Sequence, residues 1–240
     1  MDTVKISKKF NLLAYGLMIL GVAGLVYGFM TDAHRVWANI LMSNYYFLAL
    51  VIGAAFFFSL QYITQSGWSA MFRRIPESLM QYIPFAGIIM VLLVFGIADV
   101  YHWAEPHAAE HDALLAHKAP YLNVTFFMIR MVLFFAAWIL LTWYLRKLSL
   151  EEDKVGGIKY LDKMEFWSKV FIFVLAVTFS LASFDWIMSI EPHWVSTIFA
   201  FKNFASAFYH GAAIITLIVI ILYKKGYFPA MNESHLLDFS

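Results

Sequence analysis

The stretch VFIFVLAVTFSLASFDWIMSI, residues 170–190, decides the fold class of this chain. It is as long as the ~20 apolar residues that a helix needs to cross the hydrocarbon core of a bilayer. Its only charged residue is Asp185, which lies near its end. The run is too long for a single β-strand. We therefore predict that these residues form a membrane-spanning helix.

Five further stretches share this length and apolar character. Together with residues 169–190 they predict six spans, and they cover residues 10–30, 45–65, 79–101, 121–145 and 203–223. None of them shows the alternation over ~10 residues that is typical of a membrane β-barrel strand. A helix also satisfies its own backbone hydrogen bonds in lipid. The sequence thus predicts an all-α, polytopic bundle of six membrane helices.

The composition of the whole chain excludes several classes of protein. Of the 240 residues, 62% are hydrophobic and 14% are charged, and the mean hydropathy is +0.71. A soluble domain carries about 25% charged residues, so a water-soluble enzyme is excluded. The net charge of +1 gives no reason to expect a nucleic-acid partner. The absence of cysteine excludes disulfides, cysteine-ligated iron–sulfur clusters and thioether-bound haem c on this chain.

The lysines and arginines predict the orientation, because positive charge collects on the cytoplasmic side of a membrane protein. With the N-terminus in the cytoplasm, the outer loops hold Arg35, Lys118 and Lys202, and Arg130 lies inside a span. The other 13 of the 17 basic residues fall on the inner side: Lys5, Lys8, Lys9, Arg73, Arg74, Arg146, Lys147, Lys154, Lys159, Lys163, Lys169, Lys224 and Lys225. We expect both ends of the chain in the cytoplasm.

The pattern divides the chain into four parts. They are the first four spans in 1–145, a cytoplasmic connection in 146–168, the last two spans in 169–225, and a tail in 226–240. The connection carries mixed charges and a Gly156-Gly157 break, and we expect a solvated elbow there. The tail becomes apolar at its end, which indicates either a cytoplasmic tail or the start of a further helix.

Charged groups at membrane depth are expensive, and they commonly line a path for ions or protons. Asp99, Arg130, Asp185 and His210 all fall in the outer half of their predicted spans, where they could form one network, and Glu191 follows the fifth span. One reading is a proton relay or gate that uses Asp185 and His210 as carriers. The other is a polar network that locks the packing of the helices. No catalytic residue and no metal ligand is expected on this chain.

Helical spacing predicts that the polar residues of the last two spans face inward. Residues three or four positions apart share a helix face. One such set is Thr178, Ala182, Asp185 and Ser189, and the other is Asn203, Ser206, His210 and Ala213. A second polar set, Ser59, Gln61, Thr64, Gln65 and Glu77, lies at the inner side, where it could admit protons or meet lipid headgroups.

Two stretches resemble a known family. They are SLQYITQSGWSAMFRRIPESLMQYIP, residues 59–84, and FDWIMSIEPHWVSTIFAFKNFASAFYHG, residues 184–211. Both are similar to the large membrane subunit of bacterial alternative complex III, a quinol:cytochrome c (or high-potential acceptor) oxidoreductase. That protein is related to the membrane subunits of the polysulfide- and nitrite-reductase D family. The resemblance covers most of the chain, and the run from Asp185 to Phe199 is its most distinctive part.

The resemblance implies an all-helical subunit of the bacterial inner membrane, without a redox cofactor of its own. Its partners are a related membrane subunit with the quinol site, an iron–sulfur subunit, and multi-haem and mono-haem cytochrome c subunits. Quinone, haem c and iron–sulfur clusters are therefore expected on those partners. The resemblance also implies a proton path through the subunit. Lipids would surround it.

The length differs from that of the family. Its members are typically longer, with about ten spans, so we expect either a fragment or a short homologue. Three other functions stay open: a quinone-binding catalytic subunit, a secondary transporter or ion channel, and a structural anchor. Most prolines lie in loops or at span ends, which argues against the broken helices of a transporter. The buried charges argue against a mere anchor.

Overall fold

The computed structural model describes residues 7–228, which form helices and no strand. Six helical segments in this range are long and apolar enough to cross a membrane. The predicted all-α bundle of six spans is thereby confirmed, and the chain has the architecture of a multi-pass membrane protein. The predicted tail falls mostly in residues 229–240, which lie outside the described part.

The spans are built from helices of different lengths. Five are single helices, or one helix with a short extension: α1 (Lys8–Thr31), α2 (Ala33–Ile63), α8 (Val124–Val155), α9 (Ile158–Trp186) with a 3-10 turn at Met188–Ile190, and α10 (Phe199–Lys224). The third span, Arg74–Val100, alternates α3 (Arg74–Leu79), α4 (Ile83–Leu92) and α5 (Ile97–Val100) with 3-10 turns at Met80–Tyr82 and Leu93–Gly96. Between spans lie α6 (Ala108–His111), α7 (Ala113–Lys118) and 3-10 turns at Trp68–Met71 and His102–Ala104.

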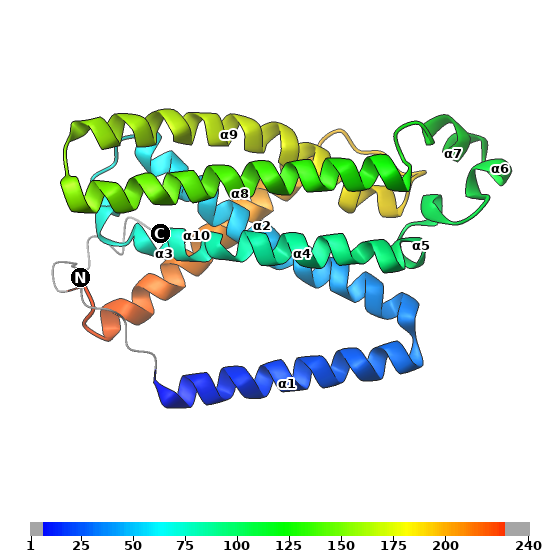
Figure 1. Ribbon diagram of the computed structural model, residues 1–240, viewed down its shortest axis with the longest axis horizontal. Helices are drawn as coiled ribbons and strands as arrows, with labels where there is room; N and C mark the ends of the chain where they lie inside the picture. The colour runs from blue at the N-terminus through cyan, green and yellow to red at the C-terminus, as the bar shows by residue number, and fades with distance from the viewer. Residues whose placement is uncertain (1–6, 229–240) are drawn as a thin grey trace.

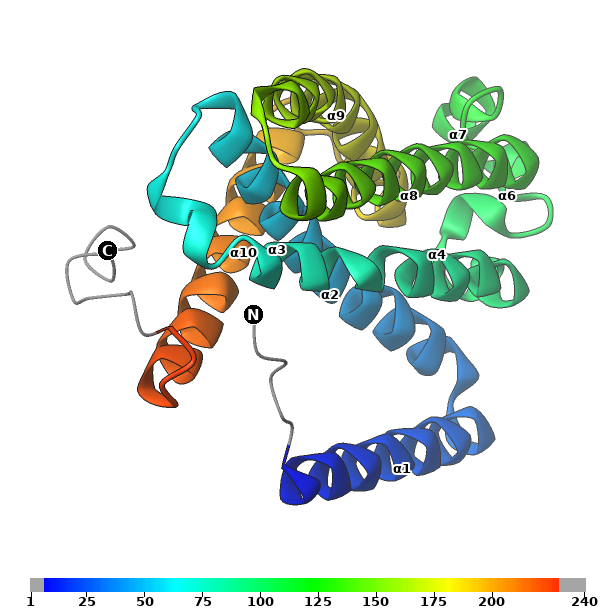
Figure 2. The same ribbon diagram turned by 60° about the vertical axis from the view of Figure 1, so that its left-hand side comes forward.

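The helices form a packed group with one helix standing aside. The third span, α8 and α9 run along one another, while α2 and α10 cross the group obliquely (Figure 1). In Figure 2 helix α1 stands clear of the others and meets α2 at the turn between them. No residue of α1 is buried against the described residues.

The crossing of α2 and α10 depends on two glycines. A Cβ atom on Gly53 would lie 1.9 Å from the carbonyl oxygen of Ala207, and one on Gly211 would lie 2.5 Å from the backbone of Ala54. The two backbones therefore touch, as small residues allow in membrane helix pairs. This contact fixes the rotation of α10 about its own axis.

The α8–α9 connection differs from the expected solvated elbow. Helix α8 continues to Val155 and α9 begins at Ile158, so the connection is a turn at Gly156 and Gly157. Both glycines have positive φ, +69° and +100°, which other residues rarely adopt. At 1.5 Å per residue α8 is about 48 Å long, which exceeds the ~30 Å hydrocarbon core. The charged residues are therefore carried on helix that extends beyond the apolar layer.

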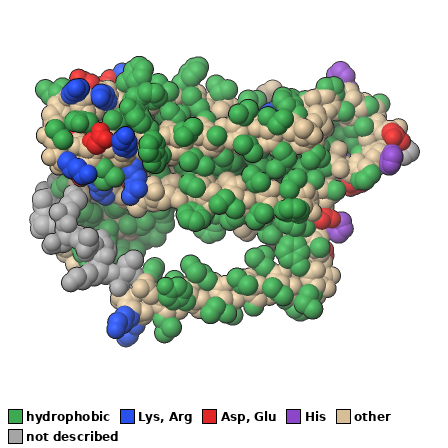
Figure 3. All heavy atoms as spheres, in the orientation of Figure 1, with side chains coloured by type: hydrophobic (Ala, Val, Ile, Leu, Met, Phe, Trp, Pro, Cys, Tyr) green, Lys and Arg blue, Asp and Glu red, His purple; other side chains and the backbone are tan. Residues whose placement is uncertain are grey.

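The charged side chains separate to the two ends of the bundle (Figure 3). We call one the basic end, defined by Lys8, Lys9, Arg73, Arg74, Arg146 and Lys147. We call the other the histidine-rich end, defined by His34, His102, His107, His117 and His193. The sequence places most lysines and arginines on the inner side of the membrane, and in the structure these residues gather at one end. We predict from the sequence that this basic end faces the cytoplasm, and the orientation stays a prediction.

Candidate functional site

A buried ion pair joins α8 to α9 near the histidine-rich end. The Nε of Arg130 donates to Oδ2 of Asp185 at 2.7 Å, and the two side chains are only 8% and 1% exposed. Each charge offsets the cost of burying the other. Removing either partner would leave an uncompensated charge in a region with little water.

Tyr121 and Phe126 hold the guanidinium of Arg130 from the other side. The Nη1 of Arg130 donates to the carbonyl oxygen of Tyr121 at 3.1 Å. Its Cζ lies 3.9 Å from the ring centre of Tyr121 and 4.3 Å from that of Phe126, within the range of cation–π attraction. Tyr121 precedes α8, and burial together with the negative charge of Asp185 raises its pKa to about 12. Its hydroxyl therefore stays protonated at neutral pH.

The ion pair keeps unused hydrogen-bonding capacity. Within the described part of the chain, Nη2 of Arg130 and Oδ1 of Asp185 have no hydrogen-bond partner. Asp185 also lines a cavity of about 440 Å³, together with Tyr121 and Ser189. A cavity of this size admits water, and water is the usual partner of a buried polar atom that the protein leaves unpaired. The carboxylate of Asp185 therefore lies beside the cavity, while its free oxygen Oδ1 is itself buried.

Two loops meet beside the cavity, and Lys118 and Pro192 from these loops line it. The Nζ of Lys118 donates to the carbonyl oxygen of Pro192 at 2.5 Å. His193 lies between two carboxylates, with Nε2 2.7 Å from Oδ2 of Asp112 and Nδ1 3.4 Å from Oε1 of Glu191. Desolvation opposes ionisation of Asp112, but the backbone N–H groups of Leu115 and Leu114 and the nearby His193 together lower its pKa.

The other candidate residues lie elsewhere. Asp99 pairs with His34, whose Nδ1 is 2.6 Å from Oδ1 of Asp99, at the surface of the histidine-rich end. Glu191 is exposed beside His193. His210 bonds to its own helix, with Nδ1 2.7 Å from the carbonyl oxygen of Ser206. Among the described residues, hydrogen bonds and ion pairs therefore join Arg130 to Asp185 but connect neither of them to Asp99 or His210.

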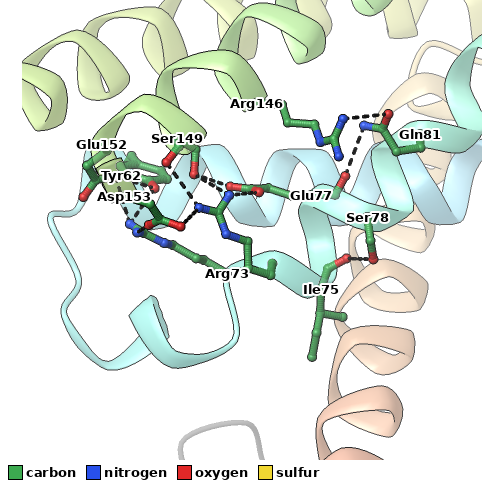
Figure 4. Close-up of polar contacts among 11 residues, drawn as sticks. Tyr62, Arg73, Ile75, Glu77, Ser78, Gln81, Arg146, Ser149, Glu152 and Asp153 are labelled. Carbon is green, nitrogen blue, oxygen red and sulfur yellow. Dashed lines mark hydrogen bonds and ion pairs between the residues drawn. The ribbon is translucent and has the colours of Figure 1, made fainter. Parts of the chain in front are cut away.

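A second polar group lies at the basic end, and we call it the inner cluster. It consists of Tyr62, Arg73, Glu77, Ser149, Glu152 and Asp153, which Figure 4 labels, and of Arg74, which contacts Glu77, Ser149 and Asp153. Its centre is Glu77, which is 3% exposed and accepts hydrogen bonds from Arg74 and from the hydroxyl of Ser149. Arg74 also donates to the carbonyl oxygen of Ser149 at 3.2 Å and pairs with Asp153.

Arg73 links the same cluster to α2. Its Nη1 donates to Oε2 of Glu152 at 2.9 Å and to the hydroxyl of Tyr62 at 3.2 Å, and Nη2 pairs with Asp153. Desolvation alone would lower the pKa of Arg73, but its interactions with Tyr62, Glu152 and Asp153 raise it above the usual value. Arg73 is therefore a permanent cation that holds the start of the third span against the end of α8.

The sequence identified this cluster only in part. It singled out Glu77 as an inner polar residue, but not the pairing of Arg73 and Arg74 with Glu152 and Asp153. A signal was present, since two adjacent arginines in one inner segment face a run of three acidic residues, 151–153, in the next. Opposite charges on neighbouring inner segments indicate such a contact.

A second cavity, of about 420 Å³, lies beside the inner cluster. Phe57, Phe58 and Leu161 give it apolar walls, while Tyr62 and Arg73 belong to both the wall and the cluster. Gln65 closes one side, where its Nε2 donates to Oε2 of Glu165 at 2.8 Å. The cavity suits a ligand with an apolar ring or tail and a few hydrogen-bonding atoms.

Comparison with known proteins gives no family for this chain. No protein-family model matches it, and no curated protein is found to be similar to it. Within residues 7–228, no three His, Cys, Asp or Glu side chains are grouped so that they could hold a metal ion.

Proposed function

We propose that this chain is an integral membrane subunit of a respiratory complex that oxidises quinol and reduces cytochrome c or another high-potential acceptor. The electron carriers belong to partners: a related membrane subunit with the quinol site, an iron–sulfur subunit, and multi-haem and mono-haem cytochromes c. The proposal places the complex in the bacterial inner membrane. Support comes from the resemblance of residues 59–84 and 184–211 to that family and from the six membrane helices.

Within that complex, we propose that Asp185 carries protons. The observation behind this role is a carboxylate that Arg130 holds through Oδ2 while Oδ1 has no partner among the described residues and the side chain lines a cavity. Protonation of Oδ1 would leave the bond between Oδ2 and Arg130 in place. Protonation weakens the ion pair, and the charge of Arg130 then favours release of the proton. Intramembrane carboxylates with this environment are typical of proton relays.

The experiment is Asp185→Asn in the intact complex, reconstituted into vesicles. Asparagine keeps an oxygen for Arg130 but cannot carry a proton. We expect quinol oxidation to continue while proton translocation, measured with a pH-sensitive dye, is lost. Asp185→Glu, which restores a titratable group, is the matched control. If Asp185→Asn assembles normally and translocates protons like the wild type, the pair is a structural lock and the relay is refuted.

Membership of the complex is tested separately by purification from native membranes. We expect multi-haem cytochrome c, seen by its visible absorption, and an iron–sulfur protein, seen by electron paramagnetic resonance, to copurify with this chain. Isolation of the chain as an oligomer of itself, without redox partners, would overturn this part of the proposal.

Quinone binding is a second candidate function, favoured by the cavity beside the inner cluster. Its aromatic walls suit a quinone ring, and the hydroxyl of Tyr62 and the amide of Gln61 are hydrogen-bonding groups that suit the ring oxygens. A photoreactive quinone analogue tests this candidate. Labelling of residues 57–73 in this chain would support it, and labelling confined to a partner subunit would refute it.

A further inference from the structure

His210 carries an unsatisfied hydrogen-bond acceptor on the outside of the bundle. Its Nδ1 lies 2.7 Å from the carbonyl oxygen of Ser206, which can only accept, so the hydrogen is on Nδ1. In the neutral ring Nε2 is then an acceptor. No residue in the described range 7–228 donates to it, since its contacts there are with Ser206 and with the rings of Tyr46 and Tyr209.

The depth of His210 makes this acceptor costly in lipid. The predicted span of α10 begins at residue 203, so His210 lies about 10 Å along the helix axis from its outer end at 1.5 Å per residue. That depth is inside the outer half of a hydrocarbon core ~30 Å thick. The side chain is half-buried rather than enclosed. Acyl chains offer no hydrogen-bond donor, so a lone polar atom at this depth calls for a protein partner.

Other polar side chains surround His210 on the same surface. We call it the His210 face, and it consists of Tyr46, Ser206, Tyr209 and His210. The rings of Tyr46 and His210 are 5.6 Å apart, and Tyr46 and Tyr209 are 49% and 72% exposed. Within the described chain, the hydroxyl groups of Tyr46, Ser206 and Tyr209 have no hydrogen-bond partner. Several polar groups at one depth distinguish this surface from the apolar, lipid-facing sides of α4 and α8.

Helix α1 borders the same space. It leans on the start of α2, where the rings of Phe29 and Trp37 are 5.2 Å apart, and then diverges (Figure 2). Figure 3 shows an opening between α1 and the rest of the bundle. Val36 of α2 is the residue that contacts Gly28 of α1. Tyr46 comes ten positions after Val36, so the two side chains leave α2 in directions that differ by about a quarter turn around its axis. The α1 contact and the His210 face therefore open on neighbouring sides of α2.

We propose that a membrane-spanning helix of a partner subunit docks on the His210 face and donates a hydrogen bond to Nε2 of His210. The donor is a polar side chain such as Ser, Thr, Asn, Gln or Tyr. A Cβ atom added at Gly16, Gly21 or Gly24 of α1 would meet no atom within 4 Å, so this helix also has open space around it. The inference rests on the proposed function in one respect, namely that the chain assembles with other membrane subunits.

The first test places a photoreactive residue on this face in the full chain and in native membranes. Tyr46→p-benzoylphenylalanine probes the face, and the same residue at Leu140, an exposed position of α8, is the control. We expect the Tyr46 probe to crosslink one other protein, at a residue that peptide mass spectrometry places in a membrane-spanning helix. Crosslinks to lipid alone, or to a second copy of this chain, would overturn the proposal.

The second test concerns the hydrogen bond itself. His210→Leu removes the acceptor, while His210→Gln keeps one. We expect His210→Leu to lower the crosslink yield, normalised to the inserted chain, about threefold to tenfold, and His210→Gln to restore most of it. Equal yields for both variants and the wild type would show that His210 accepts no bond from the partner.

The two proposals fail differently. If redox subunits copurify but the Tyr46 probe reaches lipid alone, the proposed function survives and the docking surface is refuted. If the probe captures a membrane helix but no cytochrome or iron–sulfur protein copurifies, the docking surface survives and the respiratory function is refuted.

Discussion

Arg130 and Asp185 are 55 positions apart in the chain, yet their side chains meet at 2.7 Å in a nearly solvent-free contact between α8 and α9. The pair connects two long helices that also share a hydrogen bond, from Nε1 of Trp138 on α8 to the hydroxyl of Thr178 on α9 at 2.8 Å. Removing one charge of such a pair should lower the free energy of unfolding more than removing both charges together.

We expect Arg130→Met to destabilise the isolated chain in detergent by about 3–5 kcal/mol, because Asp185 is left buried and unpaired. The double variant Arg130→Met/Asp185→Leu should recover most of that loss, because both charges are gone. Reversible unfolding monitored by tryptophan fluorescence measures both. If the loss of unfolding free energy in the double variant equals the sum of the losses in Arg130→Met and Asp185→Leu, the two residues do not act as a unit.

The α2–α10 crossing predicts a strong effect of a single methyl group. Gly53→Ala places a Cβ against the backbone of Ala207, which cannot rotate away as a side chain would. We expect a loss of about 1–3 kcal/mol in unfolding free energy, or separation of α10 from α2. Gly67→Ala is the matched control, because no atom lies within 4 Å of its added Cβ. In thermal unfolding in detergent, Gly53→Ala should melt at a lower temperature than Gly67→Ala. Equal melting temperatures for the two variants would contradict the close contact between α2 and α10.

The inner cluster predicts a dependence on the charge of Glu77. Glu77→Gln keeps the size of the side chain but removes the charge that Arg74 contacts in a buried setting. We expect a loss of about 1–3 kcal/mol in unfolding free energy, the range for a buried charged hydrogen bond. Arg146→Gln, whose contact with Gln81 is exposed, should change it by less than about 0.5 kcal/mol. A Glu77→Gln variant as stable as Arg146→Gln would contradict the central place of Glu77.

The outer loops predict an acid-sensitive contact. The pKa of Asp112 is lower in the folded protein than its ordinary value of 3.8. A lowered carboxyl pKa stabilises the fold above the ordinary value, and this contribution is lost as the pH falls below 3.8 toward the folded pKa. The protection factors of the amides of Leu114 and Leu115, that is, their exchange rates relative to the intrinsic rates at each pH, should therefore fall in acid. In Asp112→Asn this fall in protection should be absent, and persistence of the same pH dependence would assign it to another group.

The sequence identified both residues of the ion pair, Arg130 and Asp185, but it did not show which other polar residues lie beside them. Arg130 and Asp185 stand out because a charge inside an apolar run is visible in any single sequence. Whether His210 belongs to the same group depends on the rotation of α10, which the contact of Gly53 and Gly211 with the facing backbones sets. That rotation turns His210 toward Tyr46 rather than toward Asp185.

By itself the sequence determined the six spans and their approximate positions, because hydrophobic length is a local property that each segment carries without its neighbours. It did not determine where the helices end, since α8 and α9 continue past the apolar layer to Gly156 and Gly157. Only the tertiary structure decided which polar groups meet. Arg130 reaches Asp185, and Arg73 and Arg74 reach Glu152 and Asp153, because these contacts depend on how separate helices cross and rotate.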